Sequence, residues 1–101
     1  MKIELAAKQL EALGNLTRLA IYRNLAEAGS EGSYVGEIKA ELEVPGSTLS
    51  HHIAKLVKAG LLNQQRDGKN LVCRVNNENM DALMEFLVQN CCTDDWIIQS
   101  E

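Results

Sequence analysis

This sequence of 101 residues lacks a membrane-spanning segment, a signal peptide and a disulfide framework, and each absence excludes a class of protein. No uninterrupted apolar run is long enough to cross a membrane, and the N-terminus has no signal-like pattern. With 3 cysteines, an odd number, a disulfide framework is disfavoured. We therefore expect reduced thiols, a cytoplasmic location and no membrane partner.

Repeats, low-complexity tracts and linkers are absent as well, so residues 1–101 are expected to form a single domain. A core of this size is modest and is often completed by a partner subunit.

Positive charge is also scarce over the whole chain, which has a net charge of −4 and so argues against nucleic-acid binding. The charges are unevenly distributed, however. Between residues 45 and 75 five basic side chains stand against one acidic side chain, a net charge of +4, which leaves −8 for the rest. Because contact with nucleic acid needs only a local basic patch, DNA binding stays open.

Apolar residues recur at helical spacing in five segments. The first covers residues 3 to 13 and ends at Gly14, and Asn15 is expected to cap the second, which stops at "AGSEGS". Ser33 is expected to cap a short third helix. After the turn "EVPG", Pro45 suits the first turn of a fourth helix that Gly60 ends. The apolar positions of these four helices are Ile3, Ala6, Leu10, Leu13, Leu16, Leu19, Ala20, Ala28, Val35, Ile38, Leu42, Leu49, Ile53, Leu56 and Val57.

The periodicity changes after Gly60. Leu71, Cys73 and Val75 alternate with polar neighbours, and "DGKN" before them suits a hairpin turn in which Gly68 takes positive φ. Residues 62 to 75 are therefore predicted to form a two-stranded ribbon with a cationic tip.

A last helix is expected to extend to Cys91, with apolar positions Met80, Leu83, Met84, Leu87 and Val88. The predicted fold is mainly α with a small β-hairpin, in the order α-α-α-α-β-β-α, a winged helix-turn-helix.

The stretch "GSTLSHHIAKLVKAGLL", residues 46 to 62, places polar and basic side chains opposite an apolar stripe. The second helix of a helix-turn-helix enters the major groove, where its N-terminal residues contact base edges. Hydroxyl and imidazole groups can bond to base edges or phosphates, and lysine and arginine can neutralise phosphates. The predicted DNA-binding residues are Ser47, Thr48, Ser50, His51, His52, Lys55, Lys58, Arg66 and Lys69.

Alternatives to this interpretation remain open. A polar helix face can simply be solvated, and His52, next to Leu49 and Leu56, can belong to the core or contact a phosphate. A winged helix that binds protein instead of DNA would suit the acidic total charge. An enzyme is not expected, because no set of nucleophile, base and orienting residue is present.

Three stretches, "ALGNLTRLAIYRNLAEAG", "STLSHHIAKLVKAGLL" and "RDGKNLVCRVN", together resemble the ArsR–SmtB family of bacterial winged-helix repressors over roughly residues 8 to 90. The resemblance implies a homodimer formed by the first and last helices, bound to double-stranded operator DNA of dyad symmetry. It also implies release by an inducer, often a metal or metalloid ion. The groove-reading positions of the family fall on Ser47, Thr48, Ser50, His51 and His52.

The sequence departs from the familiar sensor sites of this family. The arsenite-responsive version has a Cys-x-Cys type motif on the first helix of the helix-turn-helix, where this chain has "YVGEIKAEL". The zinc and cobalt versions have Asp and His ligands along the last helix, where this chain has "MDALMEFLVQN". Some arsenic-responsive members instead carry "NCC" at the end of the last helix, which "VQNCC" resembles.

The three cysteines differ in their surroundings. Cys73 is expected on the packed face of the ribbon as an inert thiol. Cys91 continues the apolar stripe of the last helix, but its neighbour Cys92 must point elsewhere. Two adjacent thiolates suit a soft ion, so Cys91 and Cys92 form a candidate inducer site for As(III) or a related metalloid. A redox switch and a pair without function are the alternatives, and no resident cofactor is required.

Overall fold

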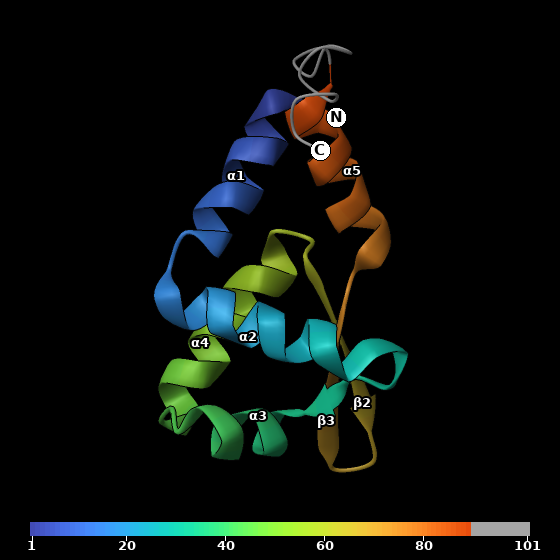
Figure 1. The fold of residues 1–101 in the computed structure, drawn as a ribbon. Coiled ribbons are helices and arrows are strands. Elements are labelled where there is room, and N and C mark those ends of the chain that lie inside the picture. Colours follow the sequence, from blue (N-terminus) through green and yellow to red (C-terminus); the bar gives the residue numbers. More distant parts are fainter. Residues whose placement is uncertain (90–101) are drawn as a thin grey trace, which may run out of the picture.

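The computed structural model describes residues 1–89 as a helical domain with a small sheet (Figure 1). In the described part, the elements in chain order are α1 (Ile3–Leu13), α2 (Leu16–Ala28), the 3-10 helix η1 (Gly29–Glu31), β1 (Ser33–Tyr34), α3 (Val35–Leu42), α4 (Gly46–Lys58), β2 (Leu62–Asp67), β3 (Asn70–Val75) and α5 (Asn77–Val88). Helices α3 and α4 form the helix-turn-helix, and the β2–β3 hairpin forms the wing. The predicted winged helix-turn-helix is therefore confirmed.

The predicted element order is wrong in one respect, because it leaves out strand β1. The sheet has three antiparallel strands in the order β1-β3-β2. Ser33 pairs with Cys73 and Tyr34 pairs with Val72. Ser33 consequently does not cap α3. Tyr34 holds that position instead, and its backbone N–H donates to the Glu37 carboxylate at 2.9 Å.

The turns that set the remaining boundaries follow the predicted chemistry. The side chain of Asn15 accepts a hydrogen bond of 3.0 Å from the backbone N–H of Arg18 and caps α2. Gly60, at φ +83°, ends α4 with the paired bonds Gly60 N–H to Val57 O and Leu61 N–H to Leu56 O. Gly68, at φ +64°, opens the two-residue hairpin loop, because Asp67 pairs with Asn70.

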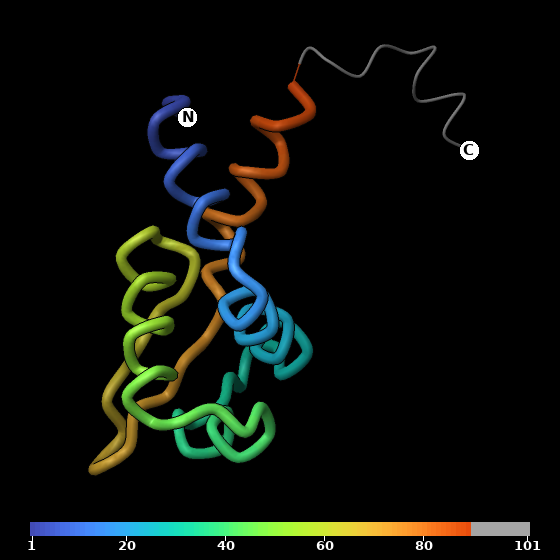
Figure 2. The backbone as a smooth tube through the Cα atoms, turned by 90° about the vertical axis from the view of Figure 1, so that its left-hand side faces the viewer, coloured from blue at the N-terminus to red at the C-terminus, as the bar shows by residue number. Residues whose placement is uncertain are grey.

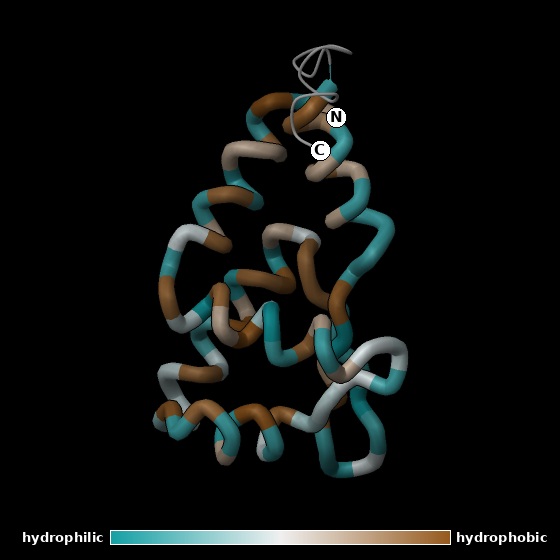
Figure 3. Tube along the Cα trace, in the orientation of Figure 1, coloured by the Kyte–Doolittle hydropathy of each residue, from teal (hydrophilic) through white to brown (hydrophobic). Residues whose placement is uncertain are grey.

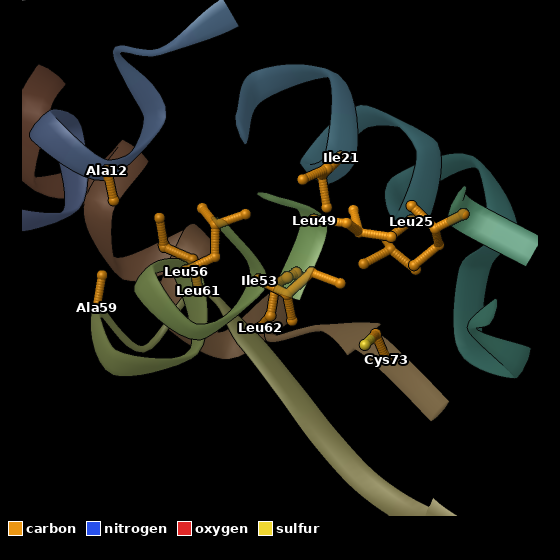
Figure 4. Packing of buried hydrophobic residues seen from close by; sticks show 11 residues of the cluster. Ala12, Ile21, Leu25, Leu49, Ile53, Leu56, Ala59, Leu61, Leu62 and Cys73 are labelled. Atoms are coloured by element: carbon orange, nitrogen blue, oxygen red, sulfur yellow. The ribbon is translucent and has the colours of Figure 1, made fainter. Parts of the chain in front are cut away.

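The core lies where α2, α3, α4 and the sheet meet (Figure 4). Ile21 and Leu25 point from α2 toward the apolar side of α4, with Cys73 below them on β3. The members of this buried cluster are Ala12, Ile21, Leu25, Ile38, Leu49, Ile53, Leu56, Ala59, Leu61, Leu62 and Cys73. The side of α4 opposite to this cluster is left free for another partner.

Two of the predicted apolar stripes are only partly buried: on α1 Ala6 is buried and Leu13 packs against this core, but Ile3 and Leu10 are exposed. Helix α1 buries Ala6, Gln9 and Ala12, and α2 buries Arg18, Ile21 and Leu25. The predicted positions Leu16 and Leu19 are exposed, because a buried arginine shifts the inner face of α2 away from them.

Helices α1 and α5 extend together from the helix-turn-helix body (Figures 1 and 2). Figure 3 shows hydrophobic segments along both of them. On α5 only Leu83 is buried, and the helix ends at Val88, three residues before its predicted end at Cys91. In the part of the chain that the structure describes, no helix has the length and apolar character needed to cross a membrane.

Candidate nucleic-acid interface

The outer face of α4 carries the polar residues that the sequence singled out. Ser47, Thr48, Ser50 and His51 are exposed, whereas Leu49, Ile53 and Leu56 are buried on the opposite face. This division follows from the helical period of 3.6 residues, which puts the apolar positions of "STLSHHIAKL" on one stripe. The exposed groups include hydrogen-bond donors and acceptors of the kind that bind base edges and phosphates.

The N-terminus of α4 is open to an anion. Pro45 is the N-cap and provides no side-chain hydrogen bond, and the first turn holds no acidic residue. The N–H of Leu49, which donates to Pro45 O at 2.9 Å, begins the helical hydrogen bonding. The free N–H groups before it and the positive end of the helix dipole favour a phosphate.

Lys39 of α3 adds a cation to this end of the helix. A Cβ atom placed on Gly46 would lie 3.6 Å from the Lys39 ammonium nitrogen. Lys39 was not among the predicted site residues, although it is the one basic side chain between residues 33 and 45. The residue belongs to the candidate interface because it lies beside the first residue of α4.

His52 is held from inside by a buried arginine. Arg18, on α2, is 8% exposed; its Nε donates to Ala12 O at 2.7 Å and its Nη1 lies 3.2 Å from Nδ1 of His52. A guanidinium has no acceptor, so Nδ1 must accept and the ring proton sits on Nε2. The inner edge of the His52 ring therefore packs against Arg18, while Nε2 remains a hydrogen-bond donor.

The environment of His52 favours the neutral ring. Burial lowers the pKa of His52 below its usual 6.5, and the positive charges of Arg18 and Lys55 and the neighbouring His51 lower it further. The ring centroids of the two histidines are 5.8 Å apart. Protonation of Nδ1 would remove the acceptor for Arg18 and place two cations together.

We therefore expect acid to destabilise the fold through His52. Below pH 6.5 an unfolded His52 binds a proton that the folded ring resists, so stability is highest above this pH and falls with decreasing pH. Denaturant unfolding at a series of pH values from about 7.5 to 5 should give a shallower pH slope for His52→Gln than for the wild type. His51→Gln, on the exposed face, is the matched control and should stay close to the wild-type slope, because burial and Arg18 lower the pKa of His52 more than His51 does. Equal slopes for His52→Gln and the wild type would contradict this role.

The wing presents Arg66 and Lys69 to solvent, and hydrogen bonds tie it to the rest of the domain, one of them next to its tip. The Tyr34 hydroxyl donates to Asp67 at 2.9 Å, a hydrogen bond that raises the pKa of Tyr34. Arg74 is engaged within the chain, with Nε donating to Ser30 O at 2.9 Å. The exposed cations of the wing are therefore those at its tip.

The remaining predicted site residues lie elsewhere. Lys55 and Lys58, on the second half of α4, line a pocket against α1. Cys91 and Cys92 lie outside the described residues. Within residues 1–89 no group of three or more His, Cys, Asp or Glu side chains could hold a metal ion.

Cys73 is buried as predicted. Its sulfur accepts from Gln64 Nε2 at 3.7 Å, and burial raises the pKa of its thiol. The thiol form is therefore favoured, and this cysteine is not suited to bind a soft ion.

A model of the helix-turn-helix domain matches residues 13–65, which include α2, α3 and α4. The regulator YgaV of Escherichia coli, described as an HTH-type transcriptional regulator, is 32% identical over 89 residues, 88% of each chain. The putative arsenical resistance operon repressor ArsR of Halobacterium salinarum is 43% identical over 60 residues, which are 59% of this chain and 46% of that protein. The chain belongs to the helix-turn-helix transcriptional regulators.

Solved structures agree with this assignment. HlyU from Vibrio cholerae superimposes with a TM-score of 0.70 at 29% identity, over 89% of this chain and 95% of that one. As a member of this family, the chain is a transcriptional regulator and not an enzyme, as the sequence predicted.

Proposed function

We propose that this regulator is a homodimeric repressor of the ArsR family that binds operator DNA by inserting α4 into the major groove. The observation that carries the proposal is the exposed polar face of α4, with an uncapped N-terminus and a cationic wing following it in the chain. An interaction module for protein would not need free N–H groups beside Lys39, whereas a phosphate suits them.

The side chains of the proposed DNA interface have two roles: some read the base sequence, and others position the duplex. Ser47, Thr48, Ser50 and His51 contact base edges, and His52 donates from Nε2 to a phosphate or a base. Cations position the duplex through its phosphates without reading sequence. These positioning residues are Lys39, Lys55, Lys58, Arg66 and Lys69.

Substitutions of residues in the two roles should reduce DNA affinity in different ways. Lys69→Ala should weaken binding to every duplex and flatten the slope of log affinity against log salt by about one unit. Ser47→Ala and His51→Ala should each cost about 1–3 kcal/mol on the cognate sequence and little on random DNA. Fluorescence anisotropy on both duplexes, over a range of salt concentrations, measures these effects. Equal losses for all three variants on both duplexes would refute the division.

The proposed dimer is supported by apolar surface on α1 and α5 that the single chain leaves exposed. Ile3 is 68% exposed and Met84 is 55% exposed, and Leu10, Leu87 and Val88 are exposed as well. A symmetric partner would cover the same residues on both copies. The two α4 helices would then lie about one turn of DNA apart, roughly 34 Å.

The proposed inducer is As(III) or a related metalloid, bound by Cys91 and Cys92. Support comes from the two adjacent thiols in the sequence and from the Halobacterium relative, which is named for arsenical resistance. Thiolates prefer soft ions, and an added ligand from a partner chain, water or a small thiol would complete the coordination. The rival inducer is an oxidant, although a disulfide between adjacent residues is strained and easily reduced.

Substitution of this pair should separate induction from DNA binding. Cys91→Ser and Cys92→Ser should each abolish release by As(III) while DNA affinity stays at the wild-type level. The buried Cys73, replaced by Ser or by the apolar Ala, is the control and should leave release unchanged in any variant that folds. The coupling between inducer and DNA should be about 1–3 kcal/mol, measured as the change in DNA affinity on adding arsenite. Normal release from the double Cys91/Cys92 variant would place the inducer site elsewhere.

A further inference from the structure

A pocket of about 230 Å³ lies between α1 and the C-terminal half of α4. Figure 2 shows these two helix ends next to each other. The pocket is lined by Lys8, Glu11 and Ala12 from α1 and by Lys55, Lys58 and Ala59 from α4 and its C-cap. The two alanines leave its floor open, because neither side chain extends beyond Cβ.

The charge around this pocket is not balanced. Among the described residues, Lys8, Lys55 and Lys58 have no ion pair or side-chain hydrogen bond. Glu11 is the one acidic side chain in the lining; its side chain is 70% exposed, and its carboxylate lies 4.0 Å from Arg18 Nη2. Three lysine side chains and a single glutamate, whose carboxylate lies near another cation, therefore line one small concave space. Bringing like charges together costs free energy that a bound anion would offset.

We propose that this pocket binds a phosphate group. Lysine ammonium groups bind phosphate as point charges, and three of them match an oxyanion with two or more negative charges. The group can belong to the backbone of the operator or to a free phosphorylated small molecule. The first source deepens the DNA-binding role proposed above for Lys55 and Lys58 and rests on it, whereas the second does not.

The position of the pocket gives its occupant a structural consequence. One wall belongs to α1, half of the proposed dimer surface, and the other belongs to the helix that reads DNA. A phosphate bound here would hold α4 against α1 at the end of α4 remote from Ser47.

Inorganic pyrophosphate is the probe for the first test, at constant ionic strength on the full chain. In ¹H–¹⁵N spectra the amide signals of Ala12 and Ala59 should shift and saturate, while the signal of Gly68 in the wing should not. Lys8→Gln and Lys58→Gln should each weaken binding by about threefold, and the double variant by about tenfold. Lys2→Gln, at the N-cap of the same helix and outside the pocket, is the matched control and should bind as the wild type does. A linear, unsaturated response, or wild-type binding by the double variant, would overturn the proposal.

A second measurement assigns the source of the phosphate. If pyrophosphate displaces a labelled duplex from the wild type but not from the Lys8→Gln/Lys58→Gln variant, the pocket holds an operator phosphate. If duplex and pyrophosphate bind together, it holds a free phosphorylated ligand. A chain that binds pyrophosphate at the pocket and no duplex would refute the proposed function while supporting the pocket. Displacement from wild type and double variant alike would count against a pocket site.

Discussion

Replacing Gly32 by Ala should destabilise the protein severely, whereas the same change at Gly29 should be tolerated. Both glycines have positive φ, +69° at Gly29 and +71° at Gly32, so each Ala is strained by its backbone. They differ in the space around them. A Cβ at Gly29 meets nothing within 4 Å, but a Cβ at Gly32 would overlap the Cys73 carbonyl oxygen and lie 2.6 Å from Cγ of Arg74.

The expected cost is about 2 kcal/mol for Gly29→Ala and about 4 kcal/mol or more for Gly32→Ala. The excess arises because β1 pairs with β3 directly after Gly32, so the backbone of β3 cannot move away without breaking the Ser33–Cys73 pairing. Urea denaturation of the wild type and the two variants measures both losses in the free energy of unfolding. A difference under about 1 kcal/mol would show that the close approach of these backbones is not rigid.

Met84→Glu should convert the protein to a monomer and remove most of its operator affinity. Met84 is 55% exposed on α5, so a glutamate costs the single chain little. In a symmetric dimer the same change buries one carboxylate from each copy in the apolar interface, which costs several kcal/mol and lowers the association constant by a factor of roughly 100 or more. A monomer also loses the second half-site, and with it most of the binding free energy.

Sedimentation velocity at micromolar concentration should show the wild type as a dimer and Met84→Glu as a monomer. Ala40→Glu places the same charge on an exposed position of α3 and should stay dimeric. Circular dichroism verifies that both variants are folded. A folded Met84→Glu dimer, or a wild-type monomer, would reject α5 as part of the interface.

The parts of this fold that the sequence could predict depend on local signals. Helix α4 follows from the stripe Leu49, Ile53 and Leu56 together with Gly60, whose positive φ ends the helix. The wing follows from "DGKN", because a glycine at the first loop position selects a tight hairpin. In both cases neighbouring residues contain enough information to fix the element.

Strand β1 could not be predicted in this way. It has two residues, which cannot show a period, and it exists only because Ser33 and Tyr34 pair with Cys73 and Val72, far along the chain. Gly32, directly before this strand, is the one local signal, since a glycine is required where backbones approach closely.

The exposed residues of the candidate interface could be predicted from the sequence, but the neighbouring side chains that contact them could not. Exposed Ser47 and His51 follow from helical phase, but no pattern in the sequence indicates that Arg18 is buried. It is buried because its guanidinium finds Ala12 O and His52 Nδ1, two acceptors on other segments. Lys39 was missed for a similar reason, because its place beside Gly46 depends on the angle between α3 and α4.

Selection of bound duplexes from a random-sequence library tests most directly the claim that this chain is a dimeric DNA reader. The wild type should enrich an inverted repeat whose half-sites are centred about 10 base pairs apart, and Ser47→Ala should relax the preference at positions within each half-site. A library that stays random after repeated rounds, or enrichment of a single site without two-fold symmetry, would contradict the account.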